Sequence, residues 1–261
     1  MSDLTNLAVM AARQAGIAIL SVYRHPMDVE IKKDGSPLTL ADQNAHQAII
    51  AVLSASRLPM VSEECDDLHM EAQRYWLIDP LDGTKDFLAS NDEFTVNIAL
   101  IEQQRPVLGV VFAPALDELY VGVPESGAWS DIAGVRSTCV STERSGRNRM
   151  AVSRFHDHSD VDIFAAANRV DERIAIGSAL KYGRLASAEV DVFPRLVGSS
   201  EWDTAAGQAV LEAAGGHVFD WHTGEPLLYG KADRRNPRLL ALRAPYIFAD
   251  FELKHYEQEL L

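Results

Sequence analysis

The sequence predicts a mixed protein of helices and strands, with an α+β first lobe and an α/β second lobe. Two helical stretches come first, at residues 4–22 and 39–56, and a series of apolar, strand-like segments follows them. Short polar turns separate these segments, as in antiparallel sheets. From residue 150 onward strands and helices alternate, which is typical of sheets covered by helices. The lobes are expected over residues 1–140 and 141–261.

The first lobe begins with an amphipathic helix at residues 4–22, whose apolar side chains recur along one stripe. A loop marked by Gly35, Ser36 and Pro37 leads into the second helix. The strands are expected at residues 59–62, 75–78, 95–102, 107–112 and 118–123, with polar turns at 103–105 and 114–117.

The loop-rich segment at residues 137–148 is the best candidate for the boundary between the lobes. After it, strands are expected at residues 150–153, 173–176 and 190–193, and helices at 160–168, 178–187 and 203–214. The tail, residues 249–261, is expected to form a last amphipathic helix.

Composition limits the classes of function. The net charge of −14 argues against broad, sequence-independent binding of nucleic acid, which needs a basic face. No apolar run is long enough for a transmembrane segment, and the polar N-terminus is no signal peptide. Cys65 and Cys139 form no disulfide framework and no zinc pattern, so we expect free thiols. These features predict a cytoplasmic protein, either free or peripheral at the cytoplasmic face of the inner membrane.

The segment WLIDPLDGTKDFL, residues 76–88, carries the strongest chemical signal. Its Pro80 and Gly83 shape the end of an apolar strand, which should deliver Asp79 and Asp82 to one side. The carbonyl of Leu81 lies between them, and such hard oxygen ligands suit magnesium. The helix expected to start at Thr84 has free N–H groups that suit a phosphate. An ordinary pair of turns that binds nothing is the alternative.

Other acidic residues stand at expected strand ends or helix starts, namely Glu63, Glu64 and Asp203. Alone, the glutamates suit a solvated pair, Asp203 a helix cap, and Asp42 a partner of a helix dipole. If these carboxylates converge, each pair about 4 Å apart costs roughly 1 to 4 kcal/mol. Only protons or cations make such a cluster stable, and magnesium is the usual cation for hard oxygens.

The motifs VSEE, WLIDPLDGT and WDTAAG occur in an order that resembles the inositol monophosphatase superfamily of lithium-sensitive, magnesium-dependent phosphomonoesterases. The segments KDGSPLTLAD, VSRFH and IGSALKYGRLASAEVDVFPR most resemble its 3′(2′),5′-bisphosphate nucleotidase branch, the CysQ type. The resemblance extends from the first helix almost to the C-terminus. It implies the layered αβαβα sandwich of the inositol monophosphatase-like sugar phosphatases.

The resemblance also implies two magnesium ions and a third ion that is bound more weakly. The first ion would have Glu63, Asp79 and the Leu81 carbonyl as ligands. The second would have Asp79, Asp82 and Asp203, and Glu64 would reach the third through water.

The resemblance gives the remaining site residues roles in catalysis and binding. Gly83 and Thr84 match the phosphate-binding turn, and the Thr84 hydroxyl, paired with Asp42, would orient or deprotonate the attacking water. The reacting phosphate would be held by Glu63, Leu81, Asp82, Gly83, Thr84 and Asp203. The second, 5′-phosphate would be held by His156, Ser178, Lys181 and Arg195.

Two features of the second lobe bear on the substrate. Inositol phosphatases carry a glutamate before the WD motif, whereas this chain has Arg195 near that place, and a cation suits a second phosphate. Without the resemblance, Lys181 and Arg195 are more simply solvated charges. Glu201 adds negative charge beside Asp203, and we expect it to weaken the binding of anions.

We therefore expect an enzyme that removes the 3′-phosphate of adenosine 3′,5′-bisphosphate to give AMP, in support of sulfate assimilation. The sulfated precursor, 3′-phosphoadenylyl sulfate, is a further expected substrate. The alternatives are an inositol-1-phosphate or fructose-1,6-bisphosphate phosphatase and a non-catalytic cation-binding regulator. The expected partner is the small nucleotide, and no oligomeric state can be derived from the sequence.

Overall fold

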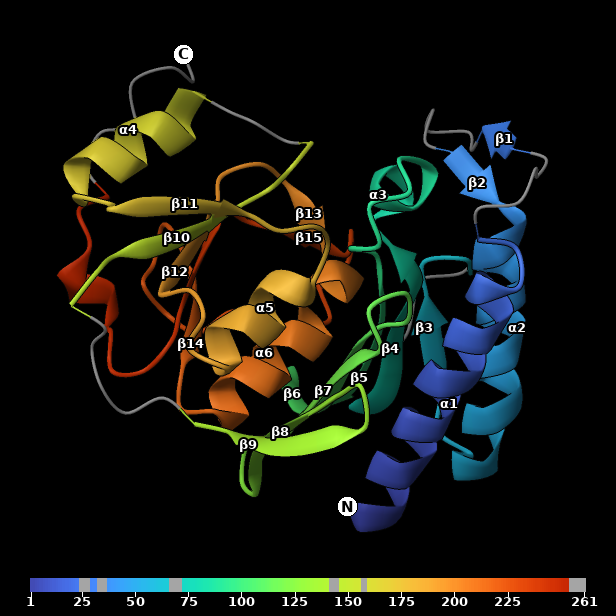
Figure 1. The fold of residues 1–261 in the computed structure, drawn as a ribbon. Coiled ribbons are helices and arrows are strands. Elements are labelled where there is room, and N and C mark those ends of the chain that lie inside the picture. The colour runs from blue at the N-terminus through green and yellow to red at the C-terminus, as the bar shows by residue number, and fades with distance from the viewer. Residues whose placement is uncertain (24–28, 32–36, 66–71, 141–145, 156–158, 254–261) are drawn as a thin grey trace.

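A computed structural model describes residues 1–23, 29–31, 37–65, 72–140, 146–155 and 159–253. Five layers stack across the molecule (Figure 1). Helices α1 (Ser2–Leu20) and α2 (Leu40–Leu53) cover one face of a seven-stranded sheet. Helices α5 (Leu180–Ala186) and α6 (Ala205–Ala213) lie between that sheet and a five-stranded sheet, and α4 (Ser159–Ala167) covers the far side. This is the predicted αβαβα sandwich.

The seven-stranded sheet has the order β3-β4-β5-β6-β7-β8-β9. Only the β3–β4 pair is parallel, and each later pair is antiparallel. The strands are β3 (Met60–Ser62), β4 (Arg74–Asp82), β5 (Thr95–Glu102), β6 (Arg105–Ala113), β7 (Glu118–Val123), β8 (Gly127–Ile132) and β9 (Val135–Cys139).

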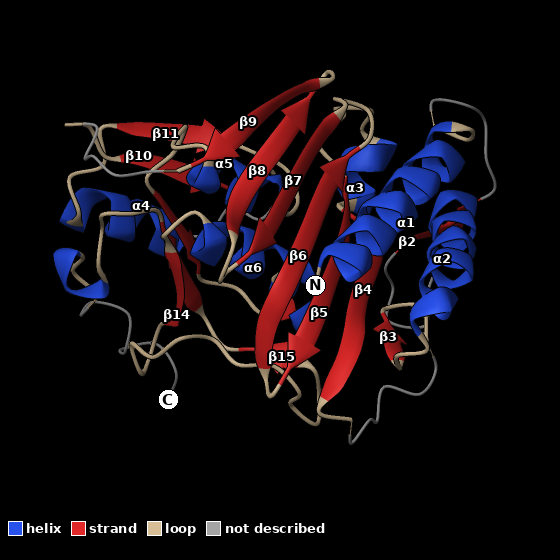
Figure 2. Ribbon diagram, turned by 90° about the horizontal axis from the view of Figure 1, so that it is seen from below, coloured by secondary structure: helices blue, strands red, loops and turns tan. Residues whose placement is uncertain are grey.

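The alternation of side chains along β4 explains why this sheet is covered on both faces. Trp76 and Ile78 belong to the apolar core shared with α1 and α2. Tyr75 and Leu77 belong to the core on the opposite face, which α5 and α6 cover. Since successive side chains of a strand point to opposite faces, a strand that is apolar throughout must be buried on both. Figure 2 shows α1 and α2 lying along this sheet.

The five-stranded sheet has the order β11-β10-β12-β16-β14. The strands β10 and β11 are parallel, as are β10 and β12, while β16 runs antiparallel to both of its neighbours. The parallel pairs are joined through helices, as the alternation in the sequence predicts. The strands are β10 (Arg149–Val152), β11 (Glu172–Ala175), β12 (Val192–Arg195), β14 (His217–Asp220) and β16 (Leu239–Leu242).

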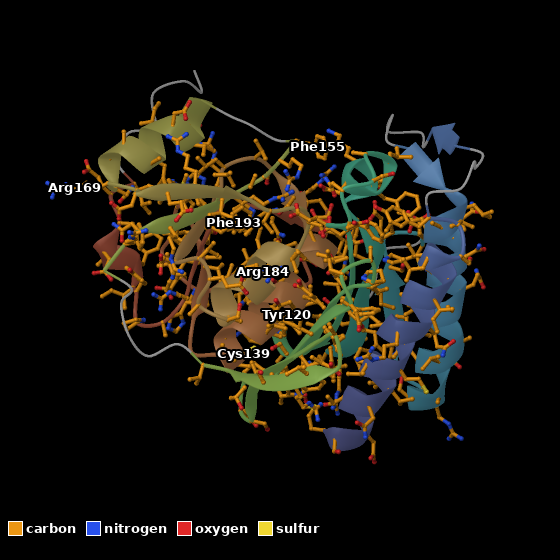
Figure 3. All side chains as sticks on the ribbon, viewed as in Figure 1. Tyr120, Cys139, Phe155, Arg169, Arg184 and Phe193 are labelled. Carbon is orange, nitrogen blue, oxygen red and sulfur yellow. The ribbon has the colours of Figure 1, made fainter. Side chains whose placement is uncertain are left out.

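Helix α6 belongs to the C-terminal half but packs tightly on the first sheet. A Cβ atom on Gly122 of β7 would lie 2.4 Å from the Cα of Val210, so only glycine permits this approach. Arg184 of α5 adds a polar tie, because its guanidinium lies 2.7 Å from the Glu118 carboxylate on β7. Figure 3 labels Arg184 on α5 and Tyr120 on β7, where the two layers meet. The halves thus share one core, and their division near residue 140 stays a prediction.

The structure corrects several element boundaries. The segment expected to be a loop from residue 137 begins inside strand β9, and β8, β14 and β16 were not predicted. Two short strand pairs were also missed, β1 (Val29–Ile31) with β2 (Pro37–Thr39) and β13 (Ser199–Ser200) with β15 (Arg235–Asn236).

The chain's end also differs from the prediction. The described start of the predicted last helix is a 3-10 turn, η3 (Phe248–Asp250), and residues 254–261 lie outside the described part. Both cysteines are free thiols, as expected. Across the described residues, no helix is both long and apolar enough to cross a membrane.

Candidate active site

Strand β4 ends in a bulge that brings two aspartates to one site. Asp79 lies opposite Asn97 of β5, whereas Asp82 lies opposite Thr95, so three steps along β4 match two along β5. In a regular strand, residues three apart point to opposite faces, and the additional residue of a bulge removes that opposition. Pro80 is tolerated here because a bulge leaves a strand position unpaired.

Asp79 is the centre of an acidic cluster. Its side chain is buried, and its Oδ1 accepts a hydrogen bond from the Leu81 N–H at 3.1 Å. Burial raises the pKa of Asp79 well above its usual range, and four neighbouring carboxylates raise it further. These neighbours are Glu63, Asp82, Asp203 and Asp42. The structure therefore brings together the acidic residues that the sequence singled out, apart from Glu64.

Glu63 and Asp42 reach the cluster from neighbouring elements. Strand β3 runs parallel to β4, and the Glu63 N–H donates to the Ile78 carbonyl at 3.1 Å, so Glu63 leaves the sheet beside Asp79. Asp42 lies buried in the first turn of α2. Glu64 follows Glu63 but does not line the pocket in the part of the chain that the structure describes.

Asp203 comes from the C-terminal half, on the short 3-10 helix η2 (Glu201–Asp203). Its Oδ2 accepts a hydrogen bond from the Ser200 N–H at 3.0 Å and lies 3.6 Å from Nη2 of Arg195. Burial raises the pKa of Asp203 to about 7, although the nearby Arg195 opposes the rise. Asp203 does not cap α6 as the sequence allowed, because Thr204 occupies the N-cap position.

The turn after β4 is closed by Gly83, which has a φ of +85° and precedes α3 (Thr84–Leu88). A Cβ atom at Gly83 would lie 2.9 Å from the Cβ of Ser178, so glycine is required by conformation and by space. Ser178 has its Oγ 2.6 Å from the Thr95 hydroxyl, which itself donates to Asn97. The turn of one half thus meets the β11–α5 loop of the other.

Two basic residues of the C-terminal half, Lys181 and Arg195, differ in how far the protein itself satisfies them. Lys181 is almost fully buried, and its ammonium donates to the carbonyls of Ile176 and Ser178 at 2.8 and 2.9 Å. Burial, together with the nearby Arg195 guanidinium, lowers the pKa of Lys181 to about 8. The buried Nε of Arg195 has no hydrogen-bond partner among the described residues, which suits a ligand.

These groups line one pocket of about 360 Å³. Its acidic wall consists of Glu63, Asp82 and Asp203, together with the buried Asp79, and its basic wall consists of Lys181, Arg195 and Arg235. The other lining residues are Gly83, Thr84, Lys85, Asp86, Ser153, Arg154, Phe155, Gly177, Ser178, Ser200 and Trp202.

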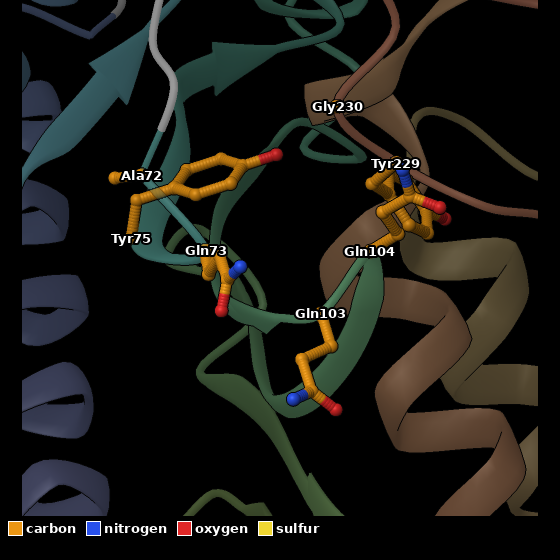
Figure 4. A pocket seen from close by; sticks show the side chains of 7 residues that line it. All are labelled: Ala72, Gln73, Tyr75, Gln103, Gln104, Tyr229 and Gly230. Atoms are coloured by element: carbon orange, nitrogen blue, oxygen red, sulfur yellow. The ribbon is translucent and has the colours of Figure 1, made fainter.

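A larger cavity, of about 500 Å³, lies elsewhere, and Figure 4 shows its lining. It is lined by Ala72, Gln73, Tyr75, Gln103, Gln104, Tyr229 and Gly230. No carboxylate or cation lines it among the described residues, so the smaller, charged pocket is the candidate active site.

The acidic cluster fits divalent cations in its donor chemistry. Several carboxylates share a buried site, which is stable when cations neutralise it, and oxygen ligands suit magnesium. Within the described residues, however, no three acidic, histidine or cysteine side chains already stand at metal-binding geometry. Side-chain rotation would have to complete the site. The Leu81 carbonyl as ligand and the Asp42–Thr84 pair stay predictions.

His156, which was predicted to hold the second phosphate, lies outside the described residues. Other residues of the pocket were not predicted from the sequence. Arg154 and Phe155 line the pocket, and both stand in the SRFH motif. That motif was the sequence signal that could have identified them. Asp86 and Trp202 stand within recognised motifs too, but Arg235 stands in a polar stretch that carries no signal.

Comparison with known proteins finds relatives that all belong to one family. The profile of the inositol monophosphatase family matches residues 1–247. The 3′(2′),5′-bisphosphate nucleotidase CysQ of Escherichia coli (strain K12) is 42% identical over 225 residues, which cover 84% of this chain and 90% of that protein. The CysQ protein of Haemophilus influenzae is 33% identical over 239 residues, covering 88% of each.

Solved structures agree with the sequence comparison. A crystal structure of CysQ from Bacteroides thetaiotaomicron, a bacterial member of the inositol monophosphatase family, has a TM-score of 0.83. It is 34% identical, and the match covers 92% of this chain and 97% of that one. An inositol monophosphatase from Zymomonas mobilis has a TM-score of 0.76 at 27% identity, with 92% of each chain covered.

Proposed function

This chain belongs to the inositol monophosphatase family, and from that membership we propose that it is a 3′(2′),5′-bisphosphate nucleotidase. It hydrolyses the 3′-phosphate of adenosine 3′,5′-bisphosphate to AMP and phosphate, and it also accepts 3′-phosphoadenylyl sulfate. The names of its relatives support this assignment. The reaction supports sulfate assimilation and takes place in the cytoplasm.

One structural observation carries the proposal: a single pocket combines a wall of carboxylates with a wall of cations. A monophosphate needs only the acidic wall and its metal ions. Lys181, Arg195 and Arg235 add positive charge to the lining of the same pocket, which a second phosphate can use and a neutral polyol cannot. The unsatisfied Nε of Arg195 is the donor best placed to be completed by a ligand.

The chain's own residues have distinct tasks in this proposal. Glu63, Asp79, the Leu81 carbonyl, Asp82 and Asp203 would hold two magnesium ions, and these ions would supply positive charge for the phosphate and activate water. Phosphoryl transfer then depends mainly on positioning and on charge stabilisation.

The remaining groups orient the reactants. The Thr84 hydroxyl, with Asp42 as its partner, orients the attacking water. Gly83 lets the backbone of the turn approach the phosphate closely. Ser178 and Arg195 hold the second phosphate, while Lys181 fixes the loop that presents Ser178.

The test is phosphate release in magnesium, with adenosine 3′,5′-bisphosphate compared against inositol 1-phosphate and fructose 1,6-bisphosphate. We expect a preference for the nucleotide of at least about tenfold in kcat/KM, since a desolvated charged contact contributes roughly 1.5 to 3 kcal/mol. A preference for either sugar phosphate would keep the metal site and refute the assignment of the basic wall. Absence of turnover on all three would favour a non-catalytic cation-binding protein.

A further inference from the structure

The element that carries Asp203 is too short to hold its own position. Helix η2 has three residues, and it must keep Asp203 close to Asp79, Asp82 and Glu63, whose like charges repel it. A single turn of 3-10 helix supplies few backbone hydrogen bonds of its own. The position of Asp203 therefore depends on what anchors the other end of this turn.

Glu201, at that other end, is fully buried and is surrounded by donors. Its Oε1 accepts from both the ammonium and the backbone N–H of Lys231, each at 2.9 Å. Its Oε2 accepts a hydrogen bond from Nη1 of Arg234 at 3.1 Å, and the backbone N–H of Glu201 donates to the Arg234 carbonyl at 2.8 Å. The negative charge of Glu201 is thus neutralised locally, so the expectation that it weakens anion binding finds no support.

The same contacts connect η2 to the strand of the acidic wall. Nη1 of Arg234 also donates to the hydroxyl of Tyr75 at 3.2 Å, and its guanidinium lies over the Tyr75 ring. Tyr75 stands on β4, the strand that ends with Asp79 and Asp82. Arg234 itself has a φ of +55°, an uncommon conformation for a long side chain, which this cluster holds in place.

The cluster also touches both cavities. Arg235, next to Arg234, lines the active-site pocket through its pairing with Ser200. Tyr75 and Tyr229 line the larger cavity (Figure 4). The Lys231 ammonium lies 5.4 Å from the centroid of the Tyr229 ring. A buried ion cluster is weak evidence for stability, because desolvation offsets much of the attraction, and its best attested use is to fix a register.

We propose that Glu201 is a positioning residue for the metal site. By binding Arg234 and Lys231 it fixes η2 against β4, so that Asp203 stays opposite Asp79 and Asp82. The role rests on the proposed function only in assuming that these aspartates bind divalent cations. It adds a residue that touches neither the metal nor the substrate.

The test is calorimetric titration of the substrate-free protein with Mg²⁺ alone. Glu201→Gln keeps the shape of the side chain but removes its charge, and we expect the Kd for Mg²⁺ to rise about tenfold or more, as for other residues that orient metal ligands. Phosphate release, measured in parallel, should require correspondingly more Mg²⁺, with the KM for nucleotide at saturating Mg²⁺ changed less than about twofold.

Glu212→Gln is the matched control. Glu212 is also largely buried and accepts from Arg105 at 3.0 Å, but it does not line the pocket. Glu212→Gln should lower Tm about as much as Glu201→Gln does, but it should leave the Kd for Mg²⁺ unchanged. If Glu201→Gln melts at a lower temperature yet binds Mg²⁺ as the wild type does, Glu201 is merely structural and the inference is wrong.

Tyr75→Phe keeps the test decisive if Glu201→Gln does not fold. It deletes only the hydroxyl to which Arg234 donates, and we expect the Kd for Mg²⁺ to rise about threefold, a hydrogen-bond-sized effect. An unchanged Kd would overturn the inference. The two proposals can fail separately. If the wild-type protein binds Mg²⁺ but does not hydrolyse the nucleotide, the proposed function is wrong. The positioning role still holds in that case if Glu201→Gln weakens the binding of Mg²⁺.

Discussion

The acidic wall and the basic wall of the pocket are built on opposite electrostatic principles. On the acidic wall, burial and neighbouring carboxylates raise the pKa of Asp79, so its charge must be neutralised by a proton or by a bound cation. On the basic wall, the ammonium of Lys181 is already bonded to two backbone carbonyls. The charges of the first wall are not compensated within their cluster, whereas on the second wall Lys181 is satisfied by the protein itself and Arg195 and Arg235 keep donors for a ligand. The first should therefore control chemistry, and the second should control positioning and choice of substrate.

The largest effect is expected at the acidic wall. Asp82→Asn should lower magnesium-dependent kcat about a thousandfold, or about 4 kcal/mol, because a metal ligand acts on the transition state. Its Tm should not fall, since one of several repelling charges is gone. Steady-state kinetics and thermal melting check both. Substantial turnover by this variant would refute the assignment of Asp82 as a metal ligand.

The pH dependence of stability tests the same wall without substrate. Folding raises the pKa of Asp203 from 3.8 to about 7, so between those values the folded state keeps a proton that the unfolded state releases. Stability is then greatest at low pH and is lost as pH rises through 7, by on the order of 2 kcal/mol for a partly exposed side chain. The measurement is the difference in Tm between the wild type and Asp203→Asn. In EDTA this difference should decrease as the pH rises from 4 to 7, and Mg²⁺ should abolish the decrease. A rise instead would contradict the acidic cluster.

The buried lysine tests the basic wall. Lys181→Met leaves two carbonyls without a donor and should cost roughly 1 to 3 kcal/mol of stability. Because those carbonyls belong to the loop that carries Ser178, kcat/KM for the bisphosphate should also fall about tenfold, mostly through KM. Melting and kinetics separate the two effects. A lower Tm with an unchanged KM would reduce Lys181 to a purely structural role.

The smallest effect is expected at the pocket's rim. The Arg235 side chain is exposed and, among the described residues, has no bonded partner, so Arg235→Ala should raise KM only about threefold to tenfold. Arg238→Ala is the control, because Arg238 lies 3.5 Å from Asp160 and does not line the pocket. Equal effects of the two variants on KM would indicate a general charge effect instead of a contact made by Arg235.

The acidic wall was largely predictable from sequence because its parts are local. A strand end with Asp79, Pro80, Asp82 and Gly83 contains its own turn and bulge signals within a few residues. The partnership of Asp79 with Glu63 was implied by the resemblance of the motifs to the family. The basic wall was harder to predict, since a lysine in a helical segment gives no sign of whether its ammonium meets solvent, a ligand or two carbonyls. The environment of the ammonium depends on the loop at residues 176–178, which strand β5 contacts through the hydroxyl of Thr95.

The sequence by itself determined a mixed protein of helices and strands, because periodicity encodes these elements locally, and its motifs determined the family. The layered fold followed from the resemblance to that family, and the acidic residues of the site were predicted from the same resemblance. Only the tertiary structure decided that Glu201 is neutralised by Lys231 and Arg234 and that Arg235 reaches the pocket. These facts depend on contacts between segments far apart in the chain. The charge of a residue is written in the sequence, but whether that charge is paired, buried or free is set by the neighbours that folding brings to it.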